Sequence, residues 1–314
     1  MFGSDFGGIQ LVLDDALNEL PVSALEQSAN LRVVARTRPV LTPDSWIHHW
    51  MAGSDVIISL GKIEGRYVLR FEDGACFEVD PEAGTVTHPR PLDGLSRHQL
   101  LDQVLPRVLE HLGHLMIHGS AVAAPGGAVV FVGETGLGKS TLAASFQRVG
   151  TGILSDDCMR LTIDPDGGVS CVPTYRSLRL WPDSADTLMG AARSEPMSAG
   201  SAKRRVDLPP DPITAPARVG AICLLSEPKT TSAEIRISSV APATAVSLLL
   251  AQCFRLDPTD PDSTKRTFER CADIVERVAV VELSYPRDYD RLSEVCYALL
   301  ERAATGDWST VKAT

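Results

Sequence analysis

The segment Gly133-Glu134-Thr135-Gly136-Leu137-Gly138-Lys139-Ser140 constrains this chain more than any other feature of its sequence. It meets the spacing G-x-x-x-x-G-K-[ST], in which glycines let backbone N–H groups converge on phosphate oxygens. A short apolar run at 128–132 precedes it, and the pattern predicts a helix over 139–149. The loop would then lie between a buried strand and the positive end of a helix. The sequence therefore predicts a nucleoside-triphosphate site in an α/β fold.

The residue types in this loop have separate chemical tasks. Lys139 would place a positive charge at the β- and γ-phosphates and is a catalytic candidate, while the Ser140 hydroxyl is a candidate magnesium ligand. No NKxD-type guanine selector occurs, so the expected cofactors are ATP and Mg²⁺. The candidate nucleotide-binding residues are Gly133, Glu134, Thr135, Gly136, Leu137, Gly138, Lys139, Ser140 and Thr141.

An acidic pair, Asp156-Asp157, closely follows the predicted helix, at the end of a strand that contains Ile153 and Leu154. Two adjacent carboxylates beside bound phosphates can divide the work, one holding magnesium and the other accepting the proton of an attacking hydroxyl. The alternative is an Asp-rich turn between strands. A transport ATPase would usually carry its acidic strand end well downstream of the loop.

His118 lies on the expected strand Leu115–Ala123, one hairpin before the loop. From there its ring could point into the same cleft and orient or assist an acid–base group. A lone histidine in a strand is more often a satisfied core residue, which is the alternative.

Composition limits the partners and the location. The chain has 314 residues and a formal net charge of −10, which disfavours a nucleic-acid partner. Its seven cysteines are scattered without CxxC spacing, which suits a reducing compartment. No signal peptide is found, and no apolar run approaches the roughly 20 residues that span a bilayer. We expect a cytoplasmic protein without a membrane partner.

The chain reads as two domains. Residues 1–95 are expected to form a smaller β-rich N-terminal domain, and residues 96–314 a catalytic domain. An apolar helical stripe over 96–113, with a kink at Pro106, opens the second. The run Asp257–Ser263 is expected to be an exposed loop. The N-terminal strands are expected at Ile9–Leu13, Leu31–Thr37, Val56–Leu60, Arg66–Phe71 and Ala75–Val79.

His118-Gly119, the phosphate loop and Leu154-Ser155-Asp156-Asp157, in this order, resemble the catalytic domain of HPr serine kinase/phosphorylase. The resemblance implies a P-loop kinase fold related to phosphoenolpyruvate carboxykinase. It also implies acid–base roles for His118 and Asp156, with Asp157 supporting metal or geometry. Because members of the family include hexamers, the resemblance leaves a homo-oligomer open.

The resemblance is incomplete downstream of the acidic pair. The family carries an EIRGxG-type segment there, whereas Tyr175–Pro182 reads YRSLRLWP, so neither the phosphorylase activity nor the HPr substrate follows. The whole chain is more similar to HPr kinase-like proteins of bacterial biosynthetic clusters, including lasso peptide precursor kinases. Candidate contacts for phosphate or an acidic peptide, with solvated surface charge as the alternative, are Arg176, Arg179, Lys203, Arg204 and Arg205.

These observations predict an ATP-dependent phosphotransferase that moves the γ-phosphoryl group to a hydroxyl. The expected acceptor is a serine of a peptide or protein, with ribosomal peptide precursors among the candidates. Two alternatives stay open: a nucleotide-binding switch or sensor with little turnover, and a small-molecule kinase. The sequence does not name the acceptor.

Overall fold

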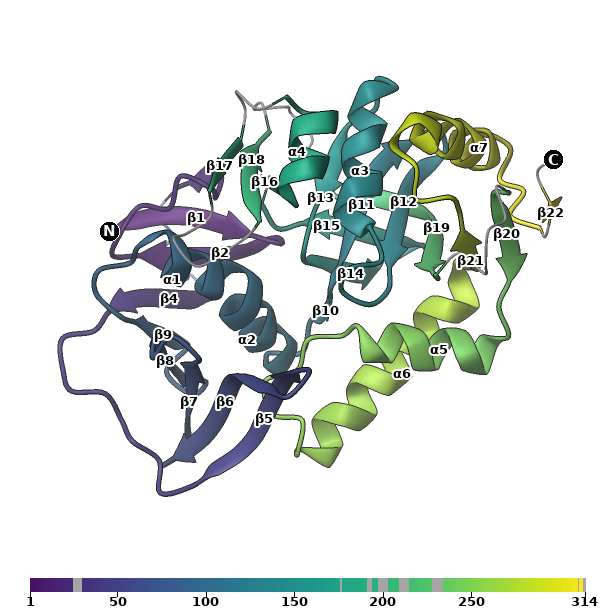
Figure 1. The fold of residues 1–314 in the computed structure, drawn as a ribbon. Helices are drawn as coiled ribbons and strands as arrows, with labels where there is room; N and C mark the ends of the chain where they lie inside the picture. Colours follow the sequence, from purple (N-terminus) through teal and green to yellow (C-terminus); the bar gives the residue numbers. More distant parts are fainter. Residues whose placement is uncertain are drawn as a thin grey trace. The chain divides into compact units, whose positions relative to one another are not determined.

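The computed structural model describes residues 1–24, 30–175, 177–190, 194–196, 203–208, 215–227, 234–309 and 311–312. The chain divides into two compact units (Figure 1). The first is Met1–His114 with Phe254–Arg266, and the second is Leu115–Cys253 with Thr267–Thr314. The fold is mixed α/β, with large sheets and few helices.

The first unit contains a nine-stranded sheet in the order β3-β1-β2-β4-β9-β8-β7-β6-β5. Along β2 and β4 buried residues alternate with more exposed ones, which is the pattern of a strand covering a core on one face. The bounds of β2 and β7 are those expected from the sequence, whereas β1, β3, β5 and β9 were not predicted. The strands are β1 (Phe2–Phe6), β2 (Ile9–Leu13), β3 (Val22–Ser23), β4 (Leu31–Ala35), β5 (Trp46–Ala52), β6 (Asp55–Ile63), β7 (Arg66–Phe71), β8 (Cys76–Asp80) and β9 (Thr85–His88).

The predicted helical stripe forms three consecutive elements, α1 (Gly94–Gln99), the π-helical turn η1 (Leu100–Val104) and α2 (Leu105–His111). Pro106 lies at the start of α2, directly after the π-helical turn, and this turn is the irregularity in the helical stripe. The apolar stripe is buried and belongs to the first unit, so the division of the chain falls at His114 and not before residue 96.

The run Asp257–Ser263 was expected to be exposed, and the structure corrects this at its two ends, while Thr259, Pro261 and Asp262 are exposed. Asp257 and Ser263 are both buried, and helix α6 (Pro261–Arg277) already begins within the run. The Glu110 carboxylate accepts hydrogen bonds from the Leu256 N–H (3.2 Å) and the Ser263 hydroxyl (2.8 Å). Tyr67 donates its hydroxyl to Asp257 (3.2 Å). Polar residues are buried here because each has a partner, which composition alone cannot reveal.

The second unit contains a ten-stranded sheet that is mixed: β12 and β21 both run parallel to β19, while β11 runs antiparallel to β12. The expected strand Leu115–Ala123 is in fact two strands, β10 and β11, with His118 between them. β10 pairs with β14, and β11 pairs with β12 and β13, so the break at His118 separates two neighbourhoods of the sheet. The strands are β10 (Leu115–Ile117), β11 (Gly119–Ala124), β12 (Gly127–Val132), β13 (Ile153–Ser155), β14 (Met159–Ile163), β15 (Val169–Pro173), β19 (Ala217–Leu225), β20 (Arg236–Ser239), β21 (Ala279–Ser284) and β22 (Val311–Lys312).

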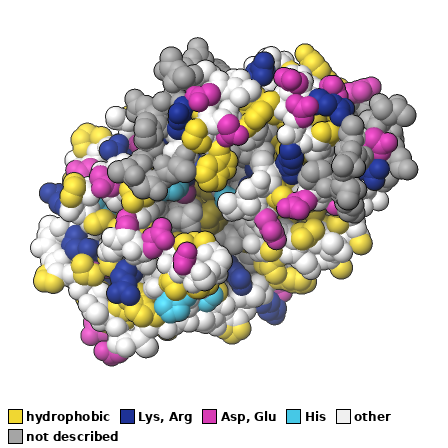
Figure 2. All heavy atoms as spheres, viewed as in Figure 1, with side chains coloured by type: hydrophobic (Ala, Val, Ile, Leu, Met, Phe, Trp, Pro, Cys, Tyr) yellow, Lys and Arg dark blue, Asp and Glu magenta, His cyan; other side chains and the backbone are white. Residues whose placement is uncertain are grey.

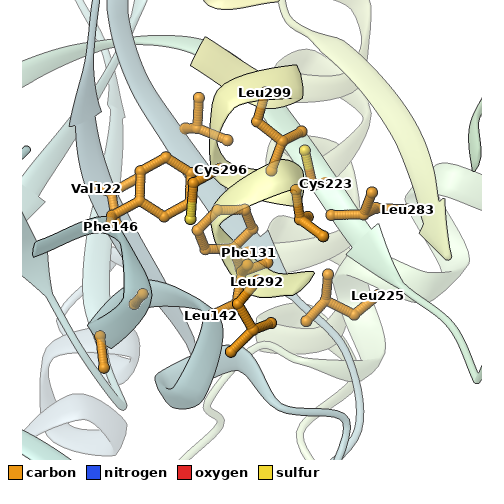
Figure 3. Close-up of a cluster of buried hydrophobic side chains, with 14 of the residues drawn as sticks. Val122, Phe131, Leu142, Phe146, Cys223, Leu225, Leu283, Leu292, Cys296 and Leu299 are labelled. Atoms are coloured by element: carbon orange, nitrogen blue, oxygen red, sulfur yellow. The ribbon is translucent and has the colours of Figure 1, made fainter. Parts of the chain in front are cut away.

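Helices cover both faces of this sheet because the central strand is apolar on both. Val129 and Phe131 of β12 point into one core cluster, together with residues of α3 (Lys139–Arg148) and α7 (Leu292–Thr305). Figure 3 shows Phe131 beside Phe146 and Leu142 of α3, with Cys296 and Leu299 of α7 close by. The other residues of β12 point into a second cluster with α5 (Pro242–Ala251) and the C-terminal part of α6. Because β12 is covered on both faces, its sequence is a continuous apolar run instead of an alternating one.

A three-stranded sheet in the order β16-β18-β17 completes the second unit, together with two short helices. Acidic, basic and apolar side chains are interspersed on the face drawn in Figure 2. No helix within the described residues is both long and apolar enough to span a bilayer. The remaining elements are β16 (Ser177–Leu180), α4 (Pro182–Leu188), β17 (Ser194–Pro196), β18 (Arg204–Asp207) and the 3-10 helix η3 (Tyr289–Arg291).

Candidate active site

The predicted phosphate loop connects the end of β12 to the start of α3, as the sequence indicated. Its glycines adopt backbone conformations that other residues avoid, with φ of 154° at Gly133 and 82° at Gly138. A Cβ at Gly138 would also lie 2.7 Å from Nη1 of Arg287. The loop is thus a tight turn before a helix N-terminus, the geometry that binds anions through backbone N–H groups.

Lys139 is buried in the first turn of α3, with 6 % of its surface exposed. Its Nζ donates to the carbonyl oxygens of Gly133 (2.7 Å) and Glu134 (3.0 Å), which folds the side chain back over the loop. Burial lowers the pKa of Lys139 to about 8, although Asp157 and Asp156 favour its charged form. The ammonium group therefore lies inside the loop, where the phosphates of a nucleotide would be held.

Asp156 directly follows β13 and is buried beside the loop. Its carboxylate accepts hydrogen bonds from the Ser120 hydroxyl (2.5 Å) and the Arg179 backbone N–H (3.2 Å), and the Ser140 hydroxyl lies close enough to favour its charged form. Burial raises the pKa of Asp156, and these hydrogen bonds work against the rise. The structure thus joins the first aspartate to the loop hydroxyl predicted to bind magnesium.

Asp157 has different surroundings. Its φ of 62° is unusual for an aspartate, and the turned backbone sends its side chain to Nη1 of Arg179 (3.0 Å). This side chain keeps 14 % of its surface exposed. Burial and the neighbouring Asp156 charge raise the pKa of Asp157 to about 7, opposed by Lys203 and Lys139. A carboxyl group in this state can exchange a proton near neutral pH.

His118 lies in the gap between β10 and β11 and contacts the acidic pair through its backbone. Nδ1 donates to the carbonyl oxygen of Asp157 (2.9 Å), and the Gly119 N–H approaches the same oxygen (3.4 Å). A carbonyl oxygen can only accept, so the neutral ring carries its proton on Nδ1 and its lone pair on Nε2. His118 thereby holds the turn at Asp157, which joins the HG motif to the acidic pair.

The basic candidates separate into distinct environments. Arg179 is buried and bonds Asp157 and the Tyr175 hydroxyl (2.8 Å), so it braces the acidic pair. Lys203 lies 5.8 Å from the centre of the Trp181 ring and is close enough to act on the charges of Asp157 and Lys139. Arg204 forms an ion pair with Asp186 (2.5 Å). Arg205 lies on β18 opposite Arg179 of β16, and Arg176 lies outside the described residues.

Thr141, predicted to bind nucleotide, lies in a hydroxyl network behind the loop. Its Oγ1 is 3.2 Å from the Ser184 hydroxyl of α4, which is 2.8 Å from the Tyr289 hydroxyl. Tyr289 in turn donates to Asp183 (2.8 Å). These contacts tie the start of α3 to α4 and η3.

Two residues of the site were missed in the sequence. Ser120 lies one residue beyond the HG pair and bonds Asp156, and its position on the same strand as His118 was the available signal. Arg287 donates to the carbonyl oxygens of Leu137 and Ser226 and lies over the Tyr285 ring. It is far from the loop in sequence, so no motif could have revealed it.

Comparison with known proteins gives little beyond this geometry. No protein-family model matches the chain, and no curated protein matches it. Among solved structures, the HPr(Ser) kinase/phosphatase from Coxiella burnetii is 12 % identical and covers 60 % of this chain and 97 % of its own, with a TM-score of 0.32. At that TM-score the likeness supports no inference about function.

Proposed function

We propose that this chain is an ATP-dependent kinase that transfers the γ-phosphoryl group to a hydroxyl, with a serine of a peptide or protein as the acceptor. One observation carries the proposal: the buried loop lysine, the loop hydroxyl and two adjacent carboxylates of raised pKa converge on one place. A site that only bound nucleotide would not need a second carboxylate able to take up a proton near neutral pH.

The donor set suits a magnesium ion. Ser140 and Asp156 supply oxygen ligands, and Mg²⁺ is commonly held by one or two carboxylates together with substrate phosphates. The described residues include no cluster of three or more histidine, cysteine or carboxylate side chains for a metal, so the nucleotide would complete the coordination. When bound, the ion would neutralise charge on the phosphates.

We propose a division of roles between the two aspartates that differs from the sequence expectation. Asp156 lies close enough to Ser140 for the hydroxyl to favour its charged form and is almost completely buried, so we assign it to the magnesium side. Asp157 is more exposed, is braced by Arg179 and has a pKa of about 7, so we assign it as the proton acceptor. His118 acts as a positioning residue that holds the turn at Asp157.

In the proposed reaction Asp157 takes the hydroxyl proton as the acceptor oxygen attacks the γ-phosphorus. The new oxygen–phosphorus bond forms while the bond to the bridging β–γ oxygen breaks, and ADP leaves. Lys139 and the backbone N–H groups of the loop stabilise the negative charge on the transferred group and on the leaving phosphate.

Mass spectrometry of candidate serine peptides incubated with Mg-ATP tests the proposal. We expect the wild type to add one phosphoryl group, Asp157→Asn to bind Mg-ATP normally without transfer, and Asp156→Asn to lose magnesium-dependent binding as well. Asp164→Asn is the matched control, since Asp164 follows the other end of β14 and bonds Ser170 (2.6 Å). Nucleotide binding without transfer to any peptide would favour a sensor, and transfer only to small alcohols a small-molecule kinase.

A further inference from the structure

The first unit contains a buried cation that the proposed reaction does not use. Arg107, on α2, has 6 % of its surface exposed. Its Nη1 donates to the backbone and side-chain oxygens of Gln103 (2.8 Å each). Its Nε is buried without an acceptor among the described residues, and the hydrogen bonds that the guanidinium makes to those residues come from Nη1. No carboxylate of the described chain forms an ion pair with it.

A buried guanidinium without a counter-charge is rare because removing it from water is costly unless an anion or a full set of acceptors replaces the solvent. Two aromatic rings supply part of that replacement: the Arg107 guanidinium lies 4.6 Å from the Trp50 ring centre and 5.4 Å from that of Phe254. Aromatic faces attract the charge but cannot accept the two N–H groups in the plane of the guanidinium.

Arg255 places a second positive charge in these surroundings, which disfavours protonation of the neighbouring His48. His48 stands edge-on to Trp50 (4.7 Å), and its pKa is lowered by burial and by the charges of Arg255, His49 and Arg107. The nearby acid Asp257 already accepts hydrogen bonds from Tyr67 (3.2 Å) and from the Thr259 hydroxyl (2.6 Å). The charge of Asp257 is thus committed to other donors.

The remaining N–H groups of Arg107 have a defined arrangement. Nε–H and one Nη2–H form one edge of the guanidinium and point in parallel, which matches two oxygens of a carboxylate or phosphate group. Trp50 stands on β5, the last strand of its sheet, where the pairing with β6 is irregular between Trp50 and Met51. A ring on an edge strand at a bulge can shift to admit a ligand more easily than one in a central strand.

We propose that Arg107, with Trp50, Phe254, His48 and Arg255, forms an oxyanion-binding site in the first unit that holds a carboxylate or phosphate group by a two-point contact. The site is separate from the phosphate loop and does not depend on the proposed kinase activity. Its ligand is either a free small anion or the acidic side chain of a peptide, and both present the same group to Arg107.

Nuclear magnetic resonance of the full chain tests the site directly. The Nε–H resonance of Arg107, identified by its loss in Arg107→Lys, should shift saturably with succinate, with inorganic phosphate or with a glutamate-rich peptide, and not with chloride at equal ionic strength. Tighter binding of the peptide than of succinate would identify a peptide side chain as the source, and equal binding a free anion. A resonance that none of these anions moves would overturn the proposal.

Variants give a second measurement by calorimetry. Arg107→Met should abolish anion binding, and Arg107→Lys should weaken it about tenfold because lysine lacks the fork. The matched control is Arg70→Met. Arg70 is exposed on β7 and lies 4.4 Å from the ring centre of Trp46, which is on β5 like Trp50, so its replacement should leave anion binding unchanged. Equal anion affinity in the wild type and Arg107→Met would contradict the site. If Arg107→Met fails to fold, the wild-type resonance still decides.

Discussion

Lys139 in the phosphate loop and Arg107 in α2 are both cations with 6 % of their surface exposed, and burial lowers the pKa of each, to about 8 and about 9. Their neighbours differ. Lys139 lies among loop carbonyl oxygens with two carboxylates close enough to favour its charge, whereas Arg107 has two aromatic rings and one glutamine. The first environment contains carboxylates that favour the charged lysine, while no carboxylate of the described residues pairs with the arginine in the second.

The largest difference between the two cations should appear in phosphoryl transfer. Lys139→Met removes the charge that stabilises the transferred group, and we expect kcat/KM to fall by about 10³. Arg107→Met should leave kcat/KM for a short peptide without acidic residues unchanged. Steady-state kinetics on both variants measures this, and a similar loss in both would remove the distinction.

The pH dependence of kcat/KM should be set by Asp157 at acidic pH and by Lys139 at alkaline pH. Because Asp157 must be ionised to accept a proton, kcat/KM should fall about tenfold per pH unit below its pKa of about 7. Loss of the Lys139 charge should lower it again above about pH 8. A bell-shaped profile is expected, and Asp157→Asn should lack the acid limb. An acid limb that persists in Asp157→Asn would assign the proton acceptor elsewhere.

Removing the contact between Arg287 and the phosphate loop should have a smaller effect on catalysis. Arg287→Met removes the hydrogen bonds to the Leu137 and Ser226 carbonyl oxygens, so the loop should be less well ordered and KM for ATP should rise about tenfold. Arg291→Met is the control, because half-buried Arg291 pairs with Glu294 (2.7 Å). Unchanged KM in Arg287→Met would show that the loop keeps its shape without this arginine.

The smallest effect concerns stability. Replacing a buried charge that lacks a counter-charge by an apolar side chain is often neutral or stabilising, so Arg107→Met should raise the free energy of unfolding by about 1 kcal/mol. Urea unfolding followed by tryptophan fluorescence measures it, with the exposed Arg70→Met as control. A marked loss of stability would mean that the aromatic rings and Gln103 already balance the charge.

Much of the candidate site could be predicted because its parts are local. The phosphate loop, the helix after it and the strand ending at Asp156 all depend on spacing and apolar runs within a few residues of each other, and the structure confirms these elements. The break at His118 was not predicted: apolar residues on both sides of His118-Gly119-Ser120 made Leu115–Ala123 look like one strand, whereas its two halves pair with different strands of the sheet.

The first unit was harder to predict. Strands such as β1 and β9 contain glycine, serine and threonine and lack a strong apolar alternation. The run Asp257–Ser263 was interpreted from its polar composition, yet it belongs to the first unit, and Asp257 and Ser263 at its ends are buried with hydrogen bonds to Tyr67 and Glu110. Pairings between residues so distant in sequence leave no local pattern.

The residues 133–140 alone specify a turn that can hold phosphates, because backbone conformation and helix polarity are local properties. Which aspartate lies beside Ser140, which is braced by Arg179, and which buried cation has no carboxylate are consequences of tertiary packing. Burial and the approach of charges distant in sequence set these pKa values and partners, and both exist only once the chain has folded.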